Sequence, residues 1–502
     1  MSDTTEAKVS LPNNNMESDD NTLADIERPM PAEAIGKSST SDFRSKETDA
    51  EKTSAAPASS NGDINDVDCD DDDVVEGLPP GGVDLAQTVS FSFHDVPDGG
   101  YRAWLVVFGA WCTSFCSFGW INSVGIFQDY YQTGPLSSYS SSTISWIPSL
   151  QIFFIMAMGP VVGRIFDAYG PRQIILVGTV LHVFGLMMAS ISTEYYQFLL
   201  SQGVCSAIGV SAIFQPALSC IPGWFNKRRG VAYGILSTGS SLGGVIFPIM
   251  LNRLLKSIGY AWAMRTCAFL ILALLIMANL TVHSRLHKHP NFKRGQSLSR
   301  EQMLAPFVEP GFALLLAGMF FLTFGIFVPI TYIPVSALAT GNISPDFAQY
   351  TVSILNGLSL VGRLLSGWIS DRIGKYNTFI LSCYVTGIVI LALWLPGTTR
   401  PTILAFSALF GFFSGAYISL IASLVAQVSP QKEIGYRTGM LFLVGSISGL
   451  ITSPIAGAIL GMGDSTNWVG VKVFAAVFLF VGSTLCLMAR FKFAGFSLTT
   501  AF

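Results

Sequence analysis

The chain has 502 residues, of which half are hydrophobic and 12% carry a charge, about half the charged share of a typical soluble domain. This composition excludes an ordinary soluble protein. The net charge of −3 combines two unlike parts, because residues 1–97 hold 22 acidic and 6 basic side chains whereas the remainder holds 10 acidic and 23 basic ones. The overall charge therefore identifies no partner, and we expect no nucleic-acid binding.

Residues 1–97 form a segment rich in Ser, Thr, Asp, Asn, Glu and Pro. Such a segment cannot bury enough apolar surface to offset the entropy that folding costs. We therefore predict a disordered acidic cytoplasmic tail over residues 1–97. Its aspartate run, Asp70 to Asp73, lacks the glycine and the distal glutamate of a calcium-binding EF-hand loop, so the sequence predicts no metal site there.

Twelve apolar stretches of about 20 residues or more follow the tail, which is the length that a helix needs to cross a bilayer. Backbone polar groups in lipid must be satisfied within the segment, so each stretch is predicted to be a helix. The expected spans are 103–128, 143–165, 173–193, 196–222, 230–255, 259–282, 311–338, 347–370, 377–396, 401–427, 434–460 and 469–490. They predict an all-α fold with two six-helix bundles, 98–282 and 311–492, a central cytoplasmic loop, 283–310, and a short cytoplasmic C-terminus, 493–502.

Basic residues gather in alternate loops, most densely at Lys227 to Arg229 and between Arg285 and Arg300. Cytoplasmic loops carry the excess of lysine and arginine in membrane proteins. We therefore expect both termini in the cytoplasm, in a multi-pass protein of the plasma membrane.

This orientation predicts that the loop between the seventh and eighth spans, which contains Asn342, faces the outside of the cell. A single cysteine placed beside Asn342, in a background without native cysteines, should react with a membrane-impermeant thiol reagent added to intact cells. Reaction only after permeabilisation would invert the topology and contradict the argument from loop charge.

The pattern G-x-x-x-D-x-x-G occurs twice, at equivalent places in the two halves. Its copies comprise Gly163, Asp167, Gly170 and Arg172 after the second span, and Gly367, Asp371 and Gly374 after the eighth. Glycine allows two helices to approach closely, and we expect each aspartate to accept hydrogen bonds from the N-terminus of the next helix. We expect the arginine to pair with an acid or a helix end across the gap between the bundles. Such a repeat is typical of a transporter whose halves rock about a central site.

Two further motifs carry a family resemblance: DGGYRAW, residues 98–104, which opens the first span, and WFNKRR, residues 224–229, which leads into the fifth. With the repeated motif, they make the chain resemble the major facilitator superfamily and, within it, the fungal-type branch of the monocarboxylate-porter (monocarboxylate transporter-like) family. The resemblance implies two pseudo-symmetric six-helix bundles, alternating access, a small-molecule substrate bound between the halves in the lipid bilayer, and no cofactor.

The resemblance also suggests which residues bind the substrate. Members that carry simple monocarboxylates have a lysine in the first span and an aspartate–arginine pair in the eighth. Here the lysine position falls on Asn122 and the aspartate position on Ser359, while Arg363 retains the arginine. Loss of two charged groups shifts the expected substrate towards a bulkier or less charged molecule, with the proton as the candidate coupling ion.

Arg363 lies within a predicted span, where an ionisable side chain usually has a function. The matching residue of the first half is Gly159, so the architecture does not require a charge there. Asn356, two turns earlier, is placed to line the same cavity. The alternative is a structural anchor that reaches the cytoplasmic interface or pairs with Asp371. We predict substrate-binding roles for Arg363, Asn122, Asn356 and Ser359.

The leading interpretation is a secondary active transporter of an organic anion, either monocarboxylate-like or a larger acidic metabolite. Export of a secondary metabolite is the first alternative, and a non-transporting nutrient sensor on the same scaffold is the second. The spans contain no nucleophile–base pair or metal-ligand set, so we expect no catalytic residue, no metal and no enzyme activity. The sequence leaves the oligomeric state open.

Overall fold

The computed structural model describes residues 96–288, 294–295, 298–341, 343–462, 467–497 and 500–502. The predicted tail, apart from Val96 and Pro97, and Asn342 lie outside the described residues. All regular structure in the described part of the chain is helical.

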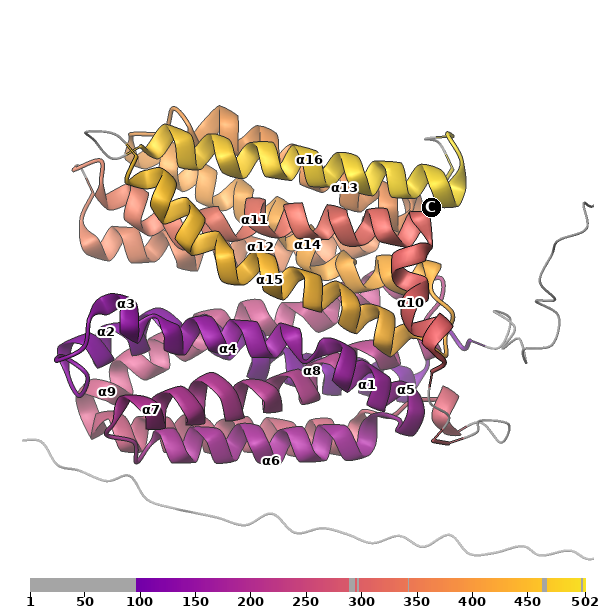
Figure 1. Cartoon of the computed structure of the whole chain (residues 1–502), viewed down its shortest axis with the longest axis horizontal. Coiled ribbons are helices and arrows are strands. Elements are labelled where there is room, and N and C mark those ends of the chain that lie inside the picture. The colour runs from indigo at the N-terminus through magenta and orange to yellow at the C-terminus, as the bar shows by residue number, and fades with distance from the viewer. Residues whose placement is uncertain (1–95, 289–293, 296–297, 342, 463–466, 498–499) are drawn as a thin grey trace, which may run out of the picture. The chain divides into compact units, whose positions relative to one another are not determined.

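The first half of the chain forms one group of helices (Figure 1). These are α1 (Tyr101–Ser114), the π-helical segment η3 (Phe115–Gly119), α2 (Val124–Thr133), α3 (Ser141–Ile144), α4 (Trp146–Ala157), α5 (Gly159–Tyr169), α6 (Pro171–Ala189), α7 (Tyr195–Phe198), the π-helical segment η4 (Leu199–Ser206), α8 (Ala207–Cys220), the 3-10 turn η5 (Ile221–Gly223) and α9 (Arg229–Thr281).

The second half forms the other group, which lies above the first in Figure 1. Its elements are the 3-10 turn η6 (Leu286–Lys288), α10 (Arg300–Val308), α11 (Pro310–Leu338), α12 (Pro345–Ile373), α13 (Lys375–Val389), the π-helical segment η7 (Ile390–Trp394), α14 (Arg400–Val428), α15 (Ile434–Leu460) and α16 (Trp468–Ala494).

Eleven described helical stretches are long and apolar enough to cross a membrane. The longest, α9, is two helices joined at Gly259, whose backbone has φ 74° and ψ 172°. A positive φ of this kind interrupts a helix and favours glycine. Counting the two parts of α9 separately gives twelve spans, six in each half, which confirms the predicted all-α fold.

The outer surface of the bundles is apolar, as contact with lipid requires. On α6, Leu176, Val180, Phe184 and Met188 recur every four residues, and the first is 56% exposed. Residues four apart share one face of a helix. A soluble protein would not leave so continuous an apolar stripe uncovered, so this face of α6 contacts the bilayer.

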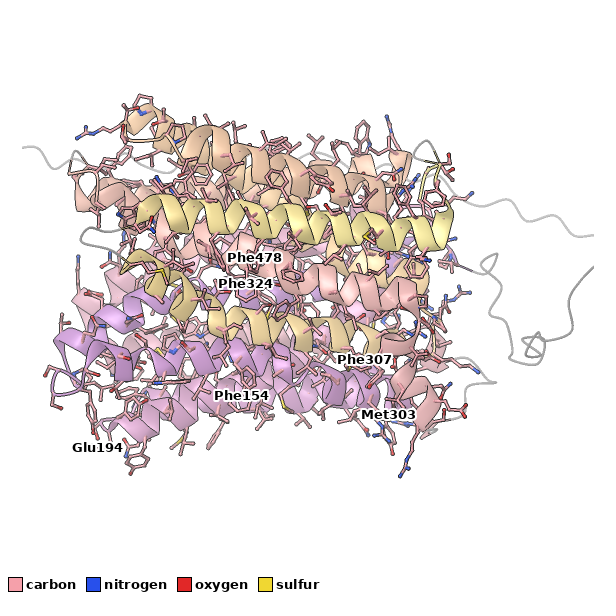
Figure 2. All side chains as sticks on the ribbon, turned by 45° about the horizontal axis from the view of Figure 1, so that its top comes forward. Phe154, Glu194, Met303, Phe307, Phe324 and Phe478 are labelled. Atoms are coloured by element: carbon pink, nitrogen blue, oxygen red, sulfur yellow. The ribbon has the colours of Figure 1, made fainter. Side chains whose placement is uncertain are left out.

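The helices of the second half are held together partly by aromatic contacts. Phe324 on α11 and Phe478 on α16 lie with ring centroids 5.2 Å apart (Figure 2). We use the term motif end for the end at which α5 and α12 finish and α9 and α15 begin. Figure 2 shows Met303 and Phe307 of α10 at that end and Glu194 at the other.

The central segment, predicted as a polar loop, contains a short helix. α10 begins with a capping box, because Ser299 Oγ accepts from Gln302 N at 3.2 Å and Gln302 Oε1 accepts from Ser299 N at 2.9 Å. Such reciprocal bonds satisfy the free N–H groups at a helix start. The Arg437 guanidinium of α15 pairs with both oxygens of Glu309, at 2.6 and 2.7 Å, and so ties the end of α10 to the second bundle.

Candidate functional site

The aspartates of the two motif copies join the bundles at the motif end. Asp167, in the last turn of α5, accepts hydrogen bonds from Gly435 N at 2.9 Å and Tyr436 N at 2.8 Å. Asp371, near the end of α12, accepts from Gly230 N at 2.7 Å and Val231 N at 2.9 Å. Each carboxylate thus caps the second and third residues of a helix in the opposite half.

This arrangement corrects the expectation that each aspartate caps the next helix of its own half. The first N–H groups of any helix lack intrahelical partners, and the N-terminus carries partial positive charge. The helices that follow the two motif copies, α6 and α13, do not need these carboxylates. α6 begins with Pro171, which has no N–H, and Tyr376 N of α13 donates to Phe502 O at 2.8 Å. The two carboxylates are therefore free to serve α15 and α9.

Glycines allow the backbones of the two halves to touch at these places. A Cβ on Gly163 would overlap the backbone of Gly435, and one on Gly367 would overlap Gly230. One turn further into the membrane, a Cβ on Gly159 would overlap Gly439. The repeated motif is thus a pair of close helix crossings, α5 with α15 and α12 with α9.

At the motif end, Arg229 rather than Arg172 bridges the halves. Arg172 is exposed and makes no hydrogen bond or ion pair with the described residues. Arg229 is buried, and its Nη1 donates to Ala426 O at 3.1 Å, in the last turn of α14. A cation is favourable at a helix C-terminus. Nothing in the run Lys227–Arg229 indicates that its last base lies inside the protein.

The two family motifs at the start of α1 and α9 contact each other. Asp98 Oδ1 accepts from Asn226 N at 2.5 Å and Lys227 N at 2.6 Å, and the ring centroids of Trp104 and Phe225 lie 5.0 Å apart. The segment 98–104 therefore fixes the loop that leads into α9, and through it the helix that Asp371 caps.

Arg363 lies in the interface between α12 and α9, two turns above Asp371. It is 3% exposed, and its Nε donates to Ser359 Oγ at 3.2 Å. Its Nη1 donates across the interface to Ser237 O and Ser240 Oγ on α9. No carboxylate lies within ion-pair distance of Arg363 in the described part of the chain, since Asp371 faces the start of α9. Its charge is therefore stabilised only by neutral groups.

The other predicted binding residues occupy different environments. Ser359 contacts Arg363 directly, whereas Asn356 donates through Nδ2 to Val352 O of its own helix at 3.2 Å. Asn122 is exposed, donates to Phe118 O at 2.7 Å and packs on Gly244 of α9. Gly244 follows Ser240 by one turn, about 6 Å along the helix axis. Asn122 and Arg363 thus contact α9 at positions one turn apart.

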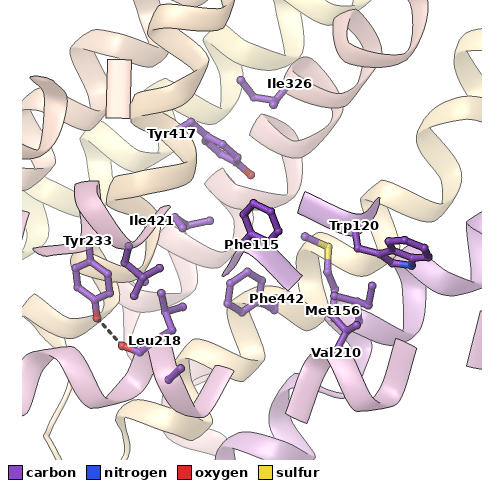
Figure 3. Packing of buried hydrophobic residues seen from close by; sticks show 14 of the residues in the cluster. Phe115, Trp120, Met156, Val210, Leu218, Tyr233, Ile326, Tyr417, Ile421 and Phe442 are labelled. Carbon is purple, nitrogen blue, oxygen red and sulfur yellow. Dashed lines mark hydrogen bonds between the residues drawn. The ribbon is translucent and has the colours of Figure 1, made fainter. Parts of the chain in front are cut away.

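Aromatic side chains from both halves form the apolar part of this region (Figure 3). Phe115 of η3, Tyr417 of α14 and Phe442 of α15 belong to one cluster of buried apolar residues. The rings of Phe214 on α8 and Phe442 lie 6.1 Å apart and link the two bundles. Phe115 packs against Gly239 and Gly243 of α9, beside Ser240, which accepts from Arg363. An aromatic ring near a buried cation suits an apolar molecule with one anionic group. No set of His, Cys, Asp or Glu able to hold a metal occurs among the described residues.

Comparison with known proteins gives the class of the chain. It belongs to the Major Facilitator Superfamily, whose family model matches residues 103–400 and again residues 315–494. The chain is therefore a multi-pass membrane transporter of a small molecule.

Fungal transporters are similar over most of the chain. The MFS transporter asaE of Aspergillus flavus is 57% identical over 81% of this chain and 90% of its own length. The fujikurins efflux protein of Gibberella fujikuroi is 53% identical over 84% of this chain and 90% of its own. The aspyridones efflux protein apdF of Emericella nidulans is 40% identical over 78% and 79%.

Solved structures support the fold. FucP in the outward conformation superposes with a TM-score of 0.61 at 14% identity, covering 77% of this chain and 99% of its own. The human organic anion transporter MFSD10 (TETRAN) gives a TM-score of 0.61 at 15% identity, with the same coverage.

Neutralising either capping carboxylate should open the motif end. Asp167→Asn or Asp371→Asn weakens two charge-assisted hydrogen bonds to a helix start, which we expect to cost roughly 2 kcal/mol in the closed arrangement. A cysteine at the buried position Ser370, in a cysteine-free background, should then react with a thiol reagent roughly tenfold faster or more.

Asp129→Asn is the matched control, because Asp129 is exposed and lies on α2, far along the chain from either crossing. It should leave the rate at Ser370→Cys unchanged. Equal rates in all three aspartate variants would contradict the capping role.

Proposed function

We propose that this transporter exports an anionic secondary metabolite, with Arg363 as the partner of the anionic group. The observation that carries the proposal is a buried guanidinium between the bundles with no carboxylate beside it among the described residues. A charged side chain at the centre of a membrane helix costs at least about 2.5 kcal/mol on insertion scales. A site that accepts this cost gains a strong partner for a carboxylate or enolate, which arginine binds with paired hydrogen bonds.

The apolar surroundings favour a substrate larger than a simple monocarboxylate. Phe115 packs against Gly239 and Gly243 of α9, beside Ser240, and Ser359 replaces the carboxylate that the resemblance would place beside Arg363. The names of the similar fungal proteins, which include efflux proteins for fujikurins and aspyridones, support export of a secondary metabolite. We infer an organic acid with a sizeable hydrophobic body.

The finer placement of the chain belongs to the same proposal. We place it in the fungal-type branch of the monocarboxylate-porter family, because Asp98 and Trp104 of one motif contact the other motif. We also propose residues 1–97 and the C-terminus on the cytoplasmic side of the plasma membrane, so that the motif end faces the cytoplasm. A proton gradient would drive export, with His182, buried and 2.9 Å from Ser206 Oγ, as the candidate proton carrier.

Arg363 variants test the proposal. Arg363→Ala removes the anion's partner and should lower export of the substrate about 100-fold, the effect of losing two hydrogen bonds to a charged group. Arg363→Lys keeps the charge but not the paired donors, so export should fall less. Ser359→Asp should lower export about tenfold, because a carboxylate one turn away competes for the guanidinium.

The measurement is an untargeted comparison of organic acids in medium and cells, with and without each variant at equal surface expression. The wild-type protein should move at least one acidic compound from cells to medium. Normal export of that compound by Arg363→Ala would make the arginine a structural anchor, and the anionic substrate would have to be abandoned. Accumulation of a neutral compound alone would have the same consequence.

A further inference from the structure

The hydrogen bonds that Arg363 Nη1 makes with α9 exist only while the motif end is closed. Arg363 belongs to α12 in the second half, and its acceptors Ser237 and Ser240 belong to α9 in the first. The two helices also touch through their backbones nearer the motif end, where a Cβ on Gly234 would meet Arg363 O and one on Gly367 would meet Gly230. Any separation of the halves at this crossing must break both bonds from Nη1.

Opening would therefore leave the guanidinium short of acceptors. Arginine carries five N–H donors in a planar fork. In the closed arrangement Ser359 Oγ, Ser237 O and Ser240 Oγ engage Nε and Nη1, and Nη2 makes no hydrogen bond with the described residues. Once α9 withdraws, Ser359 is the partner that remains on the arginine's own helix. An anion that enters from the motif end then meets a poorly satisfied cation.

We propose that the Ser240 hydroxyl and the Ser237 carbonyl compete with the substrate's anionic group for Arg363, so that closure of the motif end lowers the affinity for the anion. This inference rests on the proposed function, because it requires an anionic substrate at Arg363. It assigns to Ser240 a role that neither the motif nor the resemblance indicates: a residue that sets the difference in affinity between the two conformations.

The competition gives a direction to transport. A transporter releases its substrate on the far side only if the affinity there is lower, and a ligand shifts a two-state equilibrium only by its difference in affinity. With the motif end towards the cytoplasm, the anion would be bound tightly when that end is open and weakly when it is closed. That order of affinities suits export.

The equivalent crossing in the other half lacks this feature. Gly159 stands where Arg363 stands in the repeat and lies against Gly439 of α15. The adjacent polar side chain, Gln215, is neutral, and neither of its side-chain polar atoms has a partner among the described residues. Of these two equivalent positions, only the one on α12 therefore places a cation against the opposite half among the described residues.

The test measures binding of a fluorescent anion to the purified full chain in lipid nanodiscs. The probe is 1-pyrenebutyrate, which has an aromatic body and one carboxylate, and its neutral amide serves as the comparison ligand. Ser240→Ala removes one competing acceptor and should raise the affinity for pyrenebutyrate about three- to tenfold, the range expected for one hydrogen bond to a charged group. Ser240→Cys, a weaker acceptor, should fall between wild type and alanine.

Ser241→Ala is the matched control, because Ser241 is the next residue of α9, is 1% exposed and has no hydrogen-bond partner among the described residues. Its affinity for pyrenebutyrate should equal that of wild type within about twofold, a difference below that of one such hydrogen bond. Binding of the amide should not respond to any serine variant.

The outcomes separate the inference from the proposed function. If Ser240→Ala equals Ser241→Ala while Arg363→Ala abolishes pyrenebutyrate binding, the competition is refuted and the anion site stands. If Arg363→Ala binds pyrenebutyrate as well as wild type does, or if no variant including Ser240→Ala binds it, the anion site fails and the inference fails with it.

Discussion

Two helix starts, those of α9 and α15, need hydrogen-bond acceptors at the motif end, and each receives them from the opposite half of the molecule. Asp371 caps α9 and Asp167 caps α15. When the two bundles close over a helix N-terminus, they exclude water from it. An N–H group left without an acceptor there would then raise the free energy of the closed arrangement. The closed arrangement therefore depends on four backbone hydrogen bonds to two carboxylates. The contacts of Gly163, Gly367 and Arg363 follow from that geometry, since they lie on the same two crossings.

The sequence allowed the architecture to be predicted because its signals are local. Apolar runs, loop charges and the repeated glycine–aspartate pattern each depend on neighbouring residues, and they predicted twelve helices in two halves. The same signals predicted the wrong partners for Asp167 and Asp371, because a carboxylate in the last turn of a helix can cap any helix N-terminus that lies close enough. Pro171 is visible in the sequence, but only the packing of the two bundles shows that the start of α15 lies within hydrogen-bond distance of Asp167.

Contacts between distant segments account for what the sequence did not reveal. In the sequence, Arg229 is one of three adjacent bases in a predicted cytoplasmic loop. In the structure, its Nη1 donates to the carbonyl oxygen of Ala426, which lies 197 residues away in the chain. Ser237 and Ser240 lie within an apolar span, and nothing nearby in the chain marks them as partners of Arg363. Arg363 itself could be singled out, because a charge within an apolar span is visible without a structure.

Ser359 explains why one arginine can serve both the crossing and the substrate. An aspartate at that position would neutralise the guanidinium within its own helix in every conformation, and the charge would then respond little to the distance between α9 and α12. A serine hydroxyl, 3.2 Å from Nε, orients the side chain without neutralising it. The guanidinium consequently needs other acceptors to satisfy its N–H groups. Ser237 and Ser240 of α9 supply them when the halves are closed, and an anion supplies them when the halves are apart. The loss of a carboxylate from α12 is thus what links closure of the crossing to the strength with which an anion is held.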